Sequence, residues 1–105
     1  MVKGGFKMFD FVRVSCCVPK VAVANPQENA KQIIMKIREA SAKKANFALF
    51  PELCLSGYTC GDLFFQDQLL TSVKKALCEI LVETRSKDII VMVGAPLMLF
   101  GKLYN

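Results

Sequence analysis

The 105-residue chain contains no histidine, and none of its five cysteines forms a Cys-x-x-Cys pair. Zinc sites of the common spacings are built from these residues, so the sequence predicts no metal site. An odd number of cysteines without such spacing is typical of reduced thiols in a cytosolic protein. We therefore expect the chain to be cytoplasmic.

Long apolar runs are also missing from the sequence. Every apolar stretch is interrupted well short of the roughly 18 residues that a membrane-spanning helix requires. Near the N-terminus, lysines precede apolar residues in the manner of a signal peptide. However, Asp10 and Arg13 break that stretch, and no small-residue cleavage pattern follows. We expect no membrane partner.

Glycine is absent where a phosphate-binding loop would need it. The segment "CCVPKVAVANP", residues 16–26, runs from the end of the first expected strand into the first expected helix and contains no glycine. A nucleotide-binding α/β domain requires a glycine-rich loop at this point. The sequence therefore argues against a nucleotide-binding domain.

The net charge of +5 does not mark a nucleic-acid site. The lysines are scattered along the chain, and aromatic residues are not interleaved with them as they are in nucleic-acid grooves. Scattered lysines are typical of solvated helix surfaces, so we expect no nucleic-acid partner.

Hydrophobic residues, in contrast, are abundant. They make up 53% of the chain, whereas roughly 45–50% is typical of a globular domain. This excess predicts either elements that are buried on both faces or a surface that meets further protein.

The apolar segments alternate with amphipathic ones and predict an α/β fold. Strands are expected over residues 11–18, 47–50 and 88–96, and a fourth begins at Leu97 and is interrupted by Gly101. Continuous apolar strands separated by helices indicate a parallel sheet that helices cover.

Two helices are expected between these strands. The first begins after Asn25, a favourable N-cap, and has Pro26 in its first turn. The second begins near Asp62 or Asp67 and ends near Thr84. Its apolar stripe is expected to comprise Leu70, Val73, Leu77, Ile80 and Leu81.

Glu52 is the candidate catalytic residue, because it lies two residues beyond the second strand. Ligands bind outside the carboxyl ends of parallel strands. Gly57 can adopt a positive φ in the following loop, and Tyr58 supplies a ring and a hydroxyl. A general base that acts near neutral pH is favoured by burial among apolar residues, which we expect for Glu52. Alternatively, Glu52 caps the next turn or pairs with a lysine.

The pairs Pro51-Glu52 and Gly57-Tyr58 resemble a motif of the carbon–nitrogen hydrolase (nitrilase) superfamily. With "FVRVSCCVP" before it and "TCGDLFFQ" after it, the chain is most similar to the N-terminal glutaminase domain of the glutamine-dependent NAD synthetases. The resemblance extends from about Phe11 to the last residue. It implies that residues 1–105 are the N-terminal portion of such a domain, without its remainder and without the synthetase domain.

The resemblance also implies a four-layer α-β-β-α sandwich and a Glu-Lys-Cys mechanism. Glu52 would be the general base, a cysteine thiolate would attack the glutamine amide, and a lysine would stabilise the oxyanion. The ammonia would be used to make NAD. Tyr58 would contribute to substrate binding. The hydrolase part needs no cofactor, the absent synthetase domain would use ATP and Mg, and the complete protein would be a homo-oligomer.

The family's lysine and cysteine are expected beyond the strand that begins at Leu97, so no nucleophile is assigned within this chain. Cys54 and Cys60 belong to the glutamate's own loop, and Lys102 precedes the position of the family's lysine. We therefore expect the chain alone to be inactive. A plain amidase of the same superfamily, or an inactive fragment that serves as a binding or scaffold module, remains an alternative.

Overall fold

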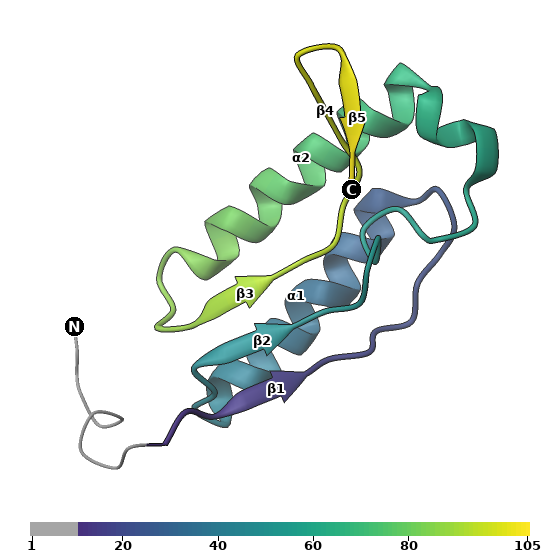
Figure 1. The fold of residues 1–105 in the computed structure, drawn as a ribbon. Coiled ribbons are helices and arrows are strands. Elements are labelled where there is room, and N and C mark those ends of the chain that lie inside the picture. The colour runs from purple at the N-terminus through teal and green to yellow at the C-terminus, as the bar shows by residue number, and fades with distance from the viewer. Residues whose placement is uncertain (1–10) are drawn as a thin grey trace.

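The computed structural model describes residues 11–105, so most of the segment considered above as a signal peptide lies outside the described residues. Strands β1 (Val14–Cys16), β2 (Phe47–Leu49) and β3 (Ile90–Met92) form a parallel sheet in the order β1-β2-β3 (Figure 1). The predicted α/β class and parallel sheet are confirmed. Each strand is shorter than the apolar run that predicted it.

Helices α1 (Pro26–Ala42) and α2 (Asp67–Thr84) connect the strands. The predicted start of α1 is confirmed, because the Asn25 side chain accepts a hydrogen bond from the backbone N–H of Glu28 at 3.2 Å. Of the two predicted starts of α2, Asp67 is correct. Asp62 lies instead in a separate 3-10 helix, Gly61–Phe65.

One face of the sheet is covered by the helices. Ser15, Ala48 and Val91 pair across the three strands, so their side chains point to the same face. Ala48 is fully buried, and α1 and α2 lie side by side over this face (Figure 1). The apolar side chains of this core include Ile33, Ile37, Phe50, Leu55 and Val73.

The opposite face is open. It carries the two flanking rows of paired residues, which are Val14, Phe47 and Ile90, and Cys16, Leu49 and Met92. Ile90 is 57% exposed and Met92 is 50% exposed. Of the two alternatives predicted from the hydrophobic excess, burial of the strands on both faces is not seen, because nothing in residues 11–105 covers the second face; the other alternative, a surface that meets further protein, stays a prediction.

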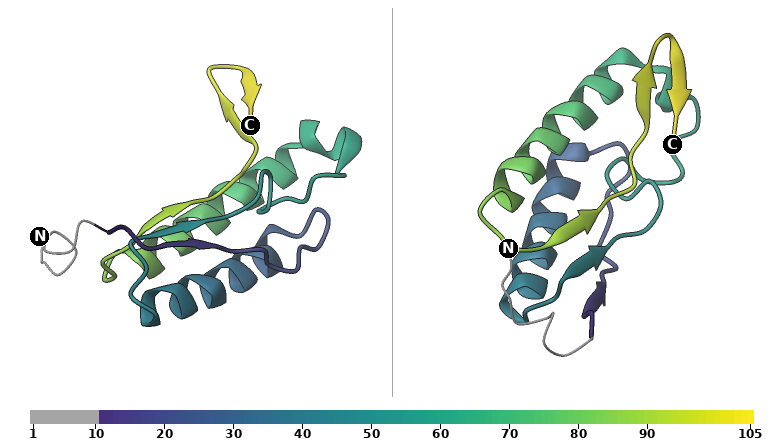
Figure 2. Two further views of the ribbon diagram at one scale, coloured as in Figure 1. Left: turned by 60° about the horizontal axis from the view of Figure 1, so that its bottom comes forward. Right: turned by 60° about the vertical axis from the view of Figure 1, so that its left-hand side comes forward.

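The predicted fourth strand is two strands. β4 (Leu97–Leu99) and β5 (Lys102–Tyr104) form an antiparallel hairpin that projects from the rest of the molecule (Figure 2). Phe100 and Gly101 form its turn, with φ values of 51° and 77°. Positive φ at both central residues matches the twist of a tight hairpin, so Gly101 reverses the chain rather than interrupting a strand.

The apolar stripe of α2 also differs from the prediction. Leu70, Val73 and Ile80 are buried as expected, but Leu81 is 61% exposed. Leu69 and Ala76 are buried instead. The buried residues Leu69, Val73, Ala76 and Ile80 recur at helical spacing, so the stripe keeps the helical period but is rotated toward Leu69 and Ala76 relative to the predicted one.

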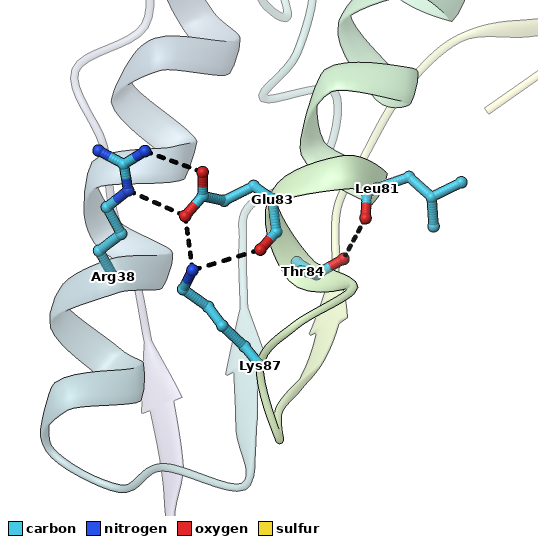
Figure 3. A network of polar contacts seen from close by, with 5 residues as sticks. All are labelled: Arg38, Leu81, Glu83, Thr84 and Lys87. Carbon is cyan, nitrogen blue, oxygen red and sulfur yellow. Dashed lines mark hydrogen bonds and ion pairs between the residues drawn. The ribbon is translucent and has the colours of Figure 1, made fainter.

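A network of charged side chains joins the two helices near their C-terminal ends (Figure 3). Arg38 of α1 donates to both carboxylate oxygens of Glu83 at 2.9 and 2.8 Å, and Lys87 donates to Glu83 Oε2 at 2.6 Å. The hydrogen bonds from Arg38, followed by those from Lys87, lower the pKa of Glu83 to about 2. The network ties α1 to the end of α2 and to the turn that leads into β3.

Within the described residues, neither helix combines the length and apolarity that crossing a bilayer would require.

Candidate active site

Glu52 lies at the carboxyl edge of the parallel sheet, as its sequence position predicts. The backbone N–H of Phe50 donates to the carbonyl of Met92 at 3.0 Å, which extends β2 alongside β3. The chain then turns tightly. Leu53 adopts a φ of 52°, and its carbonyl accepts hydrogen bonds from Ser56 at 3.2 Å and Gly57 at 2.8 Å. Such a conformation costs energy for a branched residue and is typical of functional loops.

Gly94, two residues beyond β3, lies directly under this turn. Its carbonyl accepts the N–H of Leu55 at 3.2 Å. A Cβ atom at Gly94 would lie 2.7 Å from the carbonyl oxygen of Pro51 and 2.9 Å from the carbonyl carbon of Glu52. Only glycine allows the two backbones to approach so closely, and this approach fixes where Glu52 stands.

A buried amide holds the same loop from the other side. Asn29 of α1 is 1% exposed. Its Nδ2 donates to the carbonyls of Ala22 at 2.8 Å and Leu55 at 2.9 Å, and its Oδ1 accepts the N–H of Ala22 at 2.7 Å. This role of Asn29 was not predicted from the sequence. An asparagine in the first turn of a helix was the available signal, but helix periodicity alone does not show that its side chain points inward.

The Glu52 side chain itself is exposed, so the expected burial among apolar residues is wrong for residues 11–105. Its Oε2 accepts a hydrogen bond from the Nδ2 of Asn105. Within the described chain, Glu52 forms no ion pair and accepts no backbone N–H. Neither alternative role, capping of the next turn or pairing with a lysine, is therefore seen within residues 11–105.

The remaining residues singled out by the sequence lie in the same loop. Gly57 has a φ of 94°, as predicted, and packs against the backbone of Val23. Tyr58 is 67% exposed and stands next to it. The structure thus places Tyr58 on the Glu52 loop with its ring in solvent.

The two cysteines of this loop are buried, and their thiols donate hydrogen bonds to backbone carbonyls. The Cys54 thiol is 3.8 Å from the carbonyl of Gly94, and the Cys60 thiol is 3.1 Å from that of Ser56. Burial raises the pKa of the Cys54 thiol and keeps it protonated, which disfavours a nucleophilic thiolate. Lys102 lies on β5 and is exposed. Residues 11–105 hold no group of three or more side chains that could bind a metal ion.

The fold and the site together define an α/β unit that presents one carboxylate at the carboxyl edge of a parallel sheet. No family profile matches the chain. The chain is 37% identical over 95 residues to a glutamine-dependent NAD(+) synthetase of Mycobacterium tuberculosis and 41% identical over 78 residues to that of Aquifex aeolicus. These alignments cover 90% and 74% of the chain.

A solved structure agrees with these relatives. The crystal structure of a glutamine-dependent NAD(+) synthetase from Cytophaga hutchinsonii matches 90% of the chain with a TM-score of 0.81 and 30% sequence identity. The resemblance predicted from the sequence is thereby confirmed. The chain spans 14% of the length of the two curated relatives and 16% of the solved chain.

Proposed function

We propose that residues 1–105 are the N-terminal portion of a glutamine amide hydrolase domain that supplies ammonia for NAD synthesis, and that Glu52 is its general base. The observation that carries this proposal is the position of the Glu52 carboxylate. It is exposed at the carboxyl edge of the sheet, on a loop whose backbone is fixed by Gly94 and Asn29. The similarity to enzymes named glutamine-dependent NAD(+) synthetase supports glutamine as the substrate.

In the proposed reaction, Glu52 removes the proton from a cysteine thiol, and the thiolate attacks the side-chain amide carbon of glutamine. A lysine stabilises the oxyanion of the tetrahedral intermediate. The amide nitrogen takes the proton and leaves as ammonia, and water then hydrolyses the thioester to glutamate. The cysteine and the lysine are supplied from outside this chain. Tyr58 lines the glutamine pocket beside Glu52.

The open face of the sheet supports a four-layer α-β-β-α sandwich for the complete domain. Its rows of paired residues are apolar, and they include Val14, Leu49, Ile90 and Met92. A contiguous exposed apolar surface of this kind is typical of a site that packs against further protein. A second sheet packed on this face at about 10 Å would bury it and bring further residues toward the carboxyl edge.

The requirements of the complete protein follow from the same proposal. The hydrolase reaction uses only protein side chains, whereas the synthetase reaction would consume ATP with Mg in a domain outside this chain. We propose a cytoplasmic homo-oligomer that acts as both hydrolase and ligase. Two alternatives are a plain amidase of the nitrilase superfamily, which would not couple amide hydrolysis to ATP, and an inactive fragment that binds or scaffolds.

The test is to purify the native protein from its source, determine its intact mass and measure glutamate release from glutamine, with and without nicotinate adenine dinucleotide and ATP. We expect a chain of the relatives' length, glutamine hydrolysis and coupled NAD formation. Hydrolysis of other amides without coupling would favour the plain amidase. Residues 1–105 alone should release no glutamate, and a release that Glu52→Gln abolishes would contradict the assignment of the nucleophile outside the chain.

A further inference from the structure

Asn105 is the residue that contacts the Glu52 carboxylate, although the two are 53 positions apart in sequence. The β4–β5 hairpin projects outward, and its second strand brings the chain back to the Glu52 loop (Figures 1 and 2). The Nδ2 of Asn105 then donates to Oε2 of Glu52. A segment that is otherwise remote from the sheet edge thus supplies a polar partner for the candidate base.

The chemistry of this contact divides the work between the two carboxylate oxygens. A hydrogen bond from an amide N–H satisfies Oε2 and restrains rotation of the terminal carboxylate torsion, which is otherwise broad. Oε1 keeps its lone pairs for a proton. A neutral amide also orients the carboxylate without the strong preference for the charged form that an arginine or lysine would impose.

We propose that Asn105 is a positioning residue for the Glu52 base, and that it holds Oε2 so that Oε1 receives the proton of the nucleophile. This inference rests on the proposed function. Asparagine suits this role because its side chain is short and Asn105 directly follows the last residue of β5, so the position of the amide is set by the strand. The titratable side chains on the surrounding segments are Cys54, Tyr58 and Cys60 on the Glu52 loop, and Lys102 and Tyr104 on β5. Within residues 11–105 none of them forms an ion pair or hydrogen bond with Glu52.

The contact itself is tested by NMR of the side-chain amide of Asn105 in the chain 1–105 as the pH is lowered. We expect its two N–H resonances to move as Glu52 takes up a proton, and we expect this movement to be lost in Glu52→Gln. Both proteins keep the same α-carboxylate, so titration of the chain end remains in each. The Asn46 amide, whose Oδ1 binds the N–H of Arg13 at 2.9 Å, is the internal control. Identical titrations in the two proteins would overturn the contact.

The catalytic role is tested in the native protein with Asn105→Ala, Asn105→Asp and Asn105→Gln. We expect Asn105→Ala to lower kcat about 10- to 100-fold with KM for glutamine changed less than about 2-fold, because a carboxylate misplaced by an ångström loses this much rate. Asn105→Asp has the same shape but adds a like charge. Its activity at pH 8 should be the lowest of the three, and its pH–rate profile should move to a higher pH. Asn105→Gln, which keeps the amide, should recover part of kcat.

The matched control is Phe100→Asn at the tip of the same hairpin, which should leave kcat and the pH–rate profile unchanged. If Glu52→Gln abolishes glutaminase activity while Asn105→Ala and Asn105→Asp behave like the parent, the positioning role is wrong and the proposed function stands. If Glu52→Gln retains activity, the proposed function fails, and the role of Asn105 fails with it.

Discussion

The Glu52 loop and the helical layer of this protein are stabilised in different ways. The helical layer mostly follows local rules, with a capped start at Asn25 and amphipathic helices, and a partly buried ion network at Glu83 joins the two helices. The Glu52 loop departs from those rules, with Leu53 at a positive φ, a buried amide at Asn29 and a backbone contact that only Gly94 permits. The comparison teaches that the carboxylate is placed by non-local backbone contacts, which local sequence preferences do not produce.

The strongest test of this difference is Gly94→Ala. The new methyl group would overlap the backbone of Pro51 and Glu52, so the loop or β3 must shift. We expect the free energy of unfolding to fall by about 3 kcal/mol, measured by urea denaturation. Gly61→Ala is the matched control, because no other described atom lies within 4 Å of a Cβ there and only its φ of 59° opposes the change. Equal losses in the free energy of unfolding of the two variants would show that the close approach at Gly94 is not needed.

Asn29→Ala breaks the loop from the opposite side. It leaves the carbonyls of Ala22 and Leu55 and the N–H of Ala22 without their partner in a buried place. We expect a loss of about 2 kcal/mol in the free energy of unfolding, with faster amide exchange in the Glu52 loop. Asn25→Ala removes an exposed cap and should cost about 1 kcal/mol without affecting exchange in that loop. Unchanged amide exchange in the Glu52 loop of Asn29→Ala would contradict the role of Asn29 in holding that loop.

Glu83→Gln tests the helical layer. The pKa of Glu83 is lowered to about 2, so its charge stabilises the fold above its ordinary pKa near 4.5, and this contribution disappears as the pH falls toward 2. Because Arg38 is largely exposed, we expect a loss of only about 1 kcal/mol at pH 7. Urea denaturation of both proteins at pH 7 and pH 2 measures it. If the difference in free energy of unfolding between the two proteins does not narrow at pH 2 or in 1 M NaCl, its origin is not electrostatic.

Phe100→Asn should give the smallest change in the free energy of unfolding, and it should raise that free energy where the other variants lower it. Phe100 has a φ of 51°, almost the same as the 52° of Leu53, but its side chain is fully exposed at the hairpin tip. Asparagine tolerates this conformation, so we expect the free energy of unfolding, measured by thermal denaturation, to rise by about 0.5 kcal/mol. Leu53→Asn should instead destabilise the protein, because Leu53 is half-buried within the loop. A gain at both positions would show that the Glu52 loop is no more constrained than a free turn.

The sequence predicted those parts of the molecule that follow local preferences. The start of α1 at Asn25 and Pro26, the parallel order of the strands and the position of Glu52 at the sheet edge were all predictable from capping, periodicity and strand order. Gly57 was correctly expected to have a positive φ.

The parts that depend on contacts between distant segments were not predictable. The roles of Asn29, Gly94 and Asn105 arise from contacts with Leu55, Glu52 and Glu52 that span 26, 42 and 53 residues and leave no periodic signal. The exposure of Glu52 was also misjudged, because the apolar residues near it in sequence point into the core beneath the loop. The hairpin was read as one strand because the Phe100-Gly101 turn lacks the Asn or Asp that usually marks it.

The central claim, that Glu52 is the general base, is tested most directly by the rate of glutamate release from glutamine by the native protein and its Glu52→Gln variant at equal folded concentration. Loss of a general base typically removes a factor of about 10²–10⁴ in rate. We predict a loss in this range with an unchanged unfolding midpoint, since the exposed Glu52 side chain contributes little to the core. Retention of the parent rate by Glu52→Gln would contradict the account.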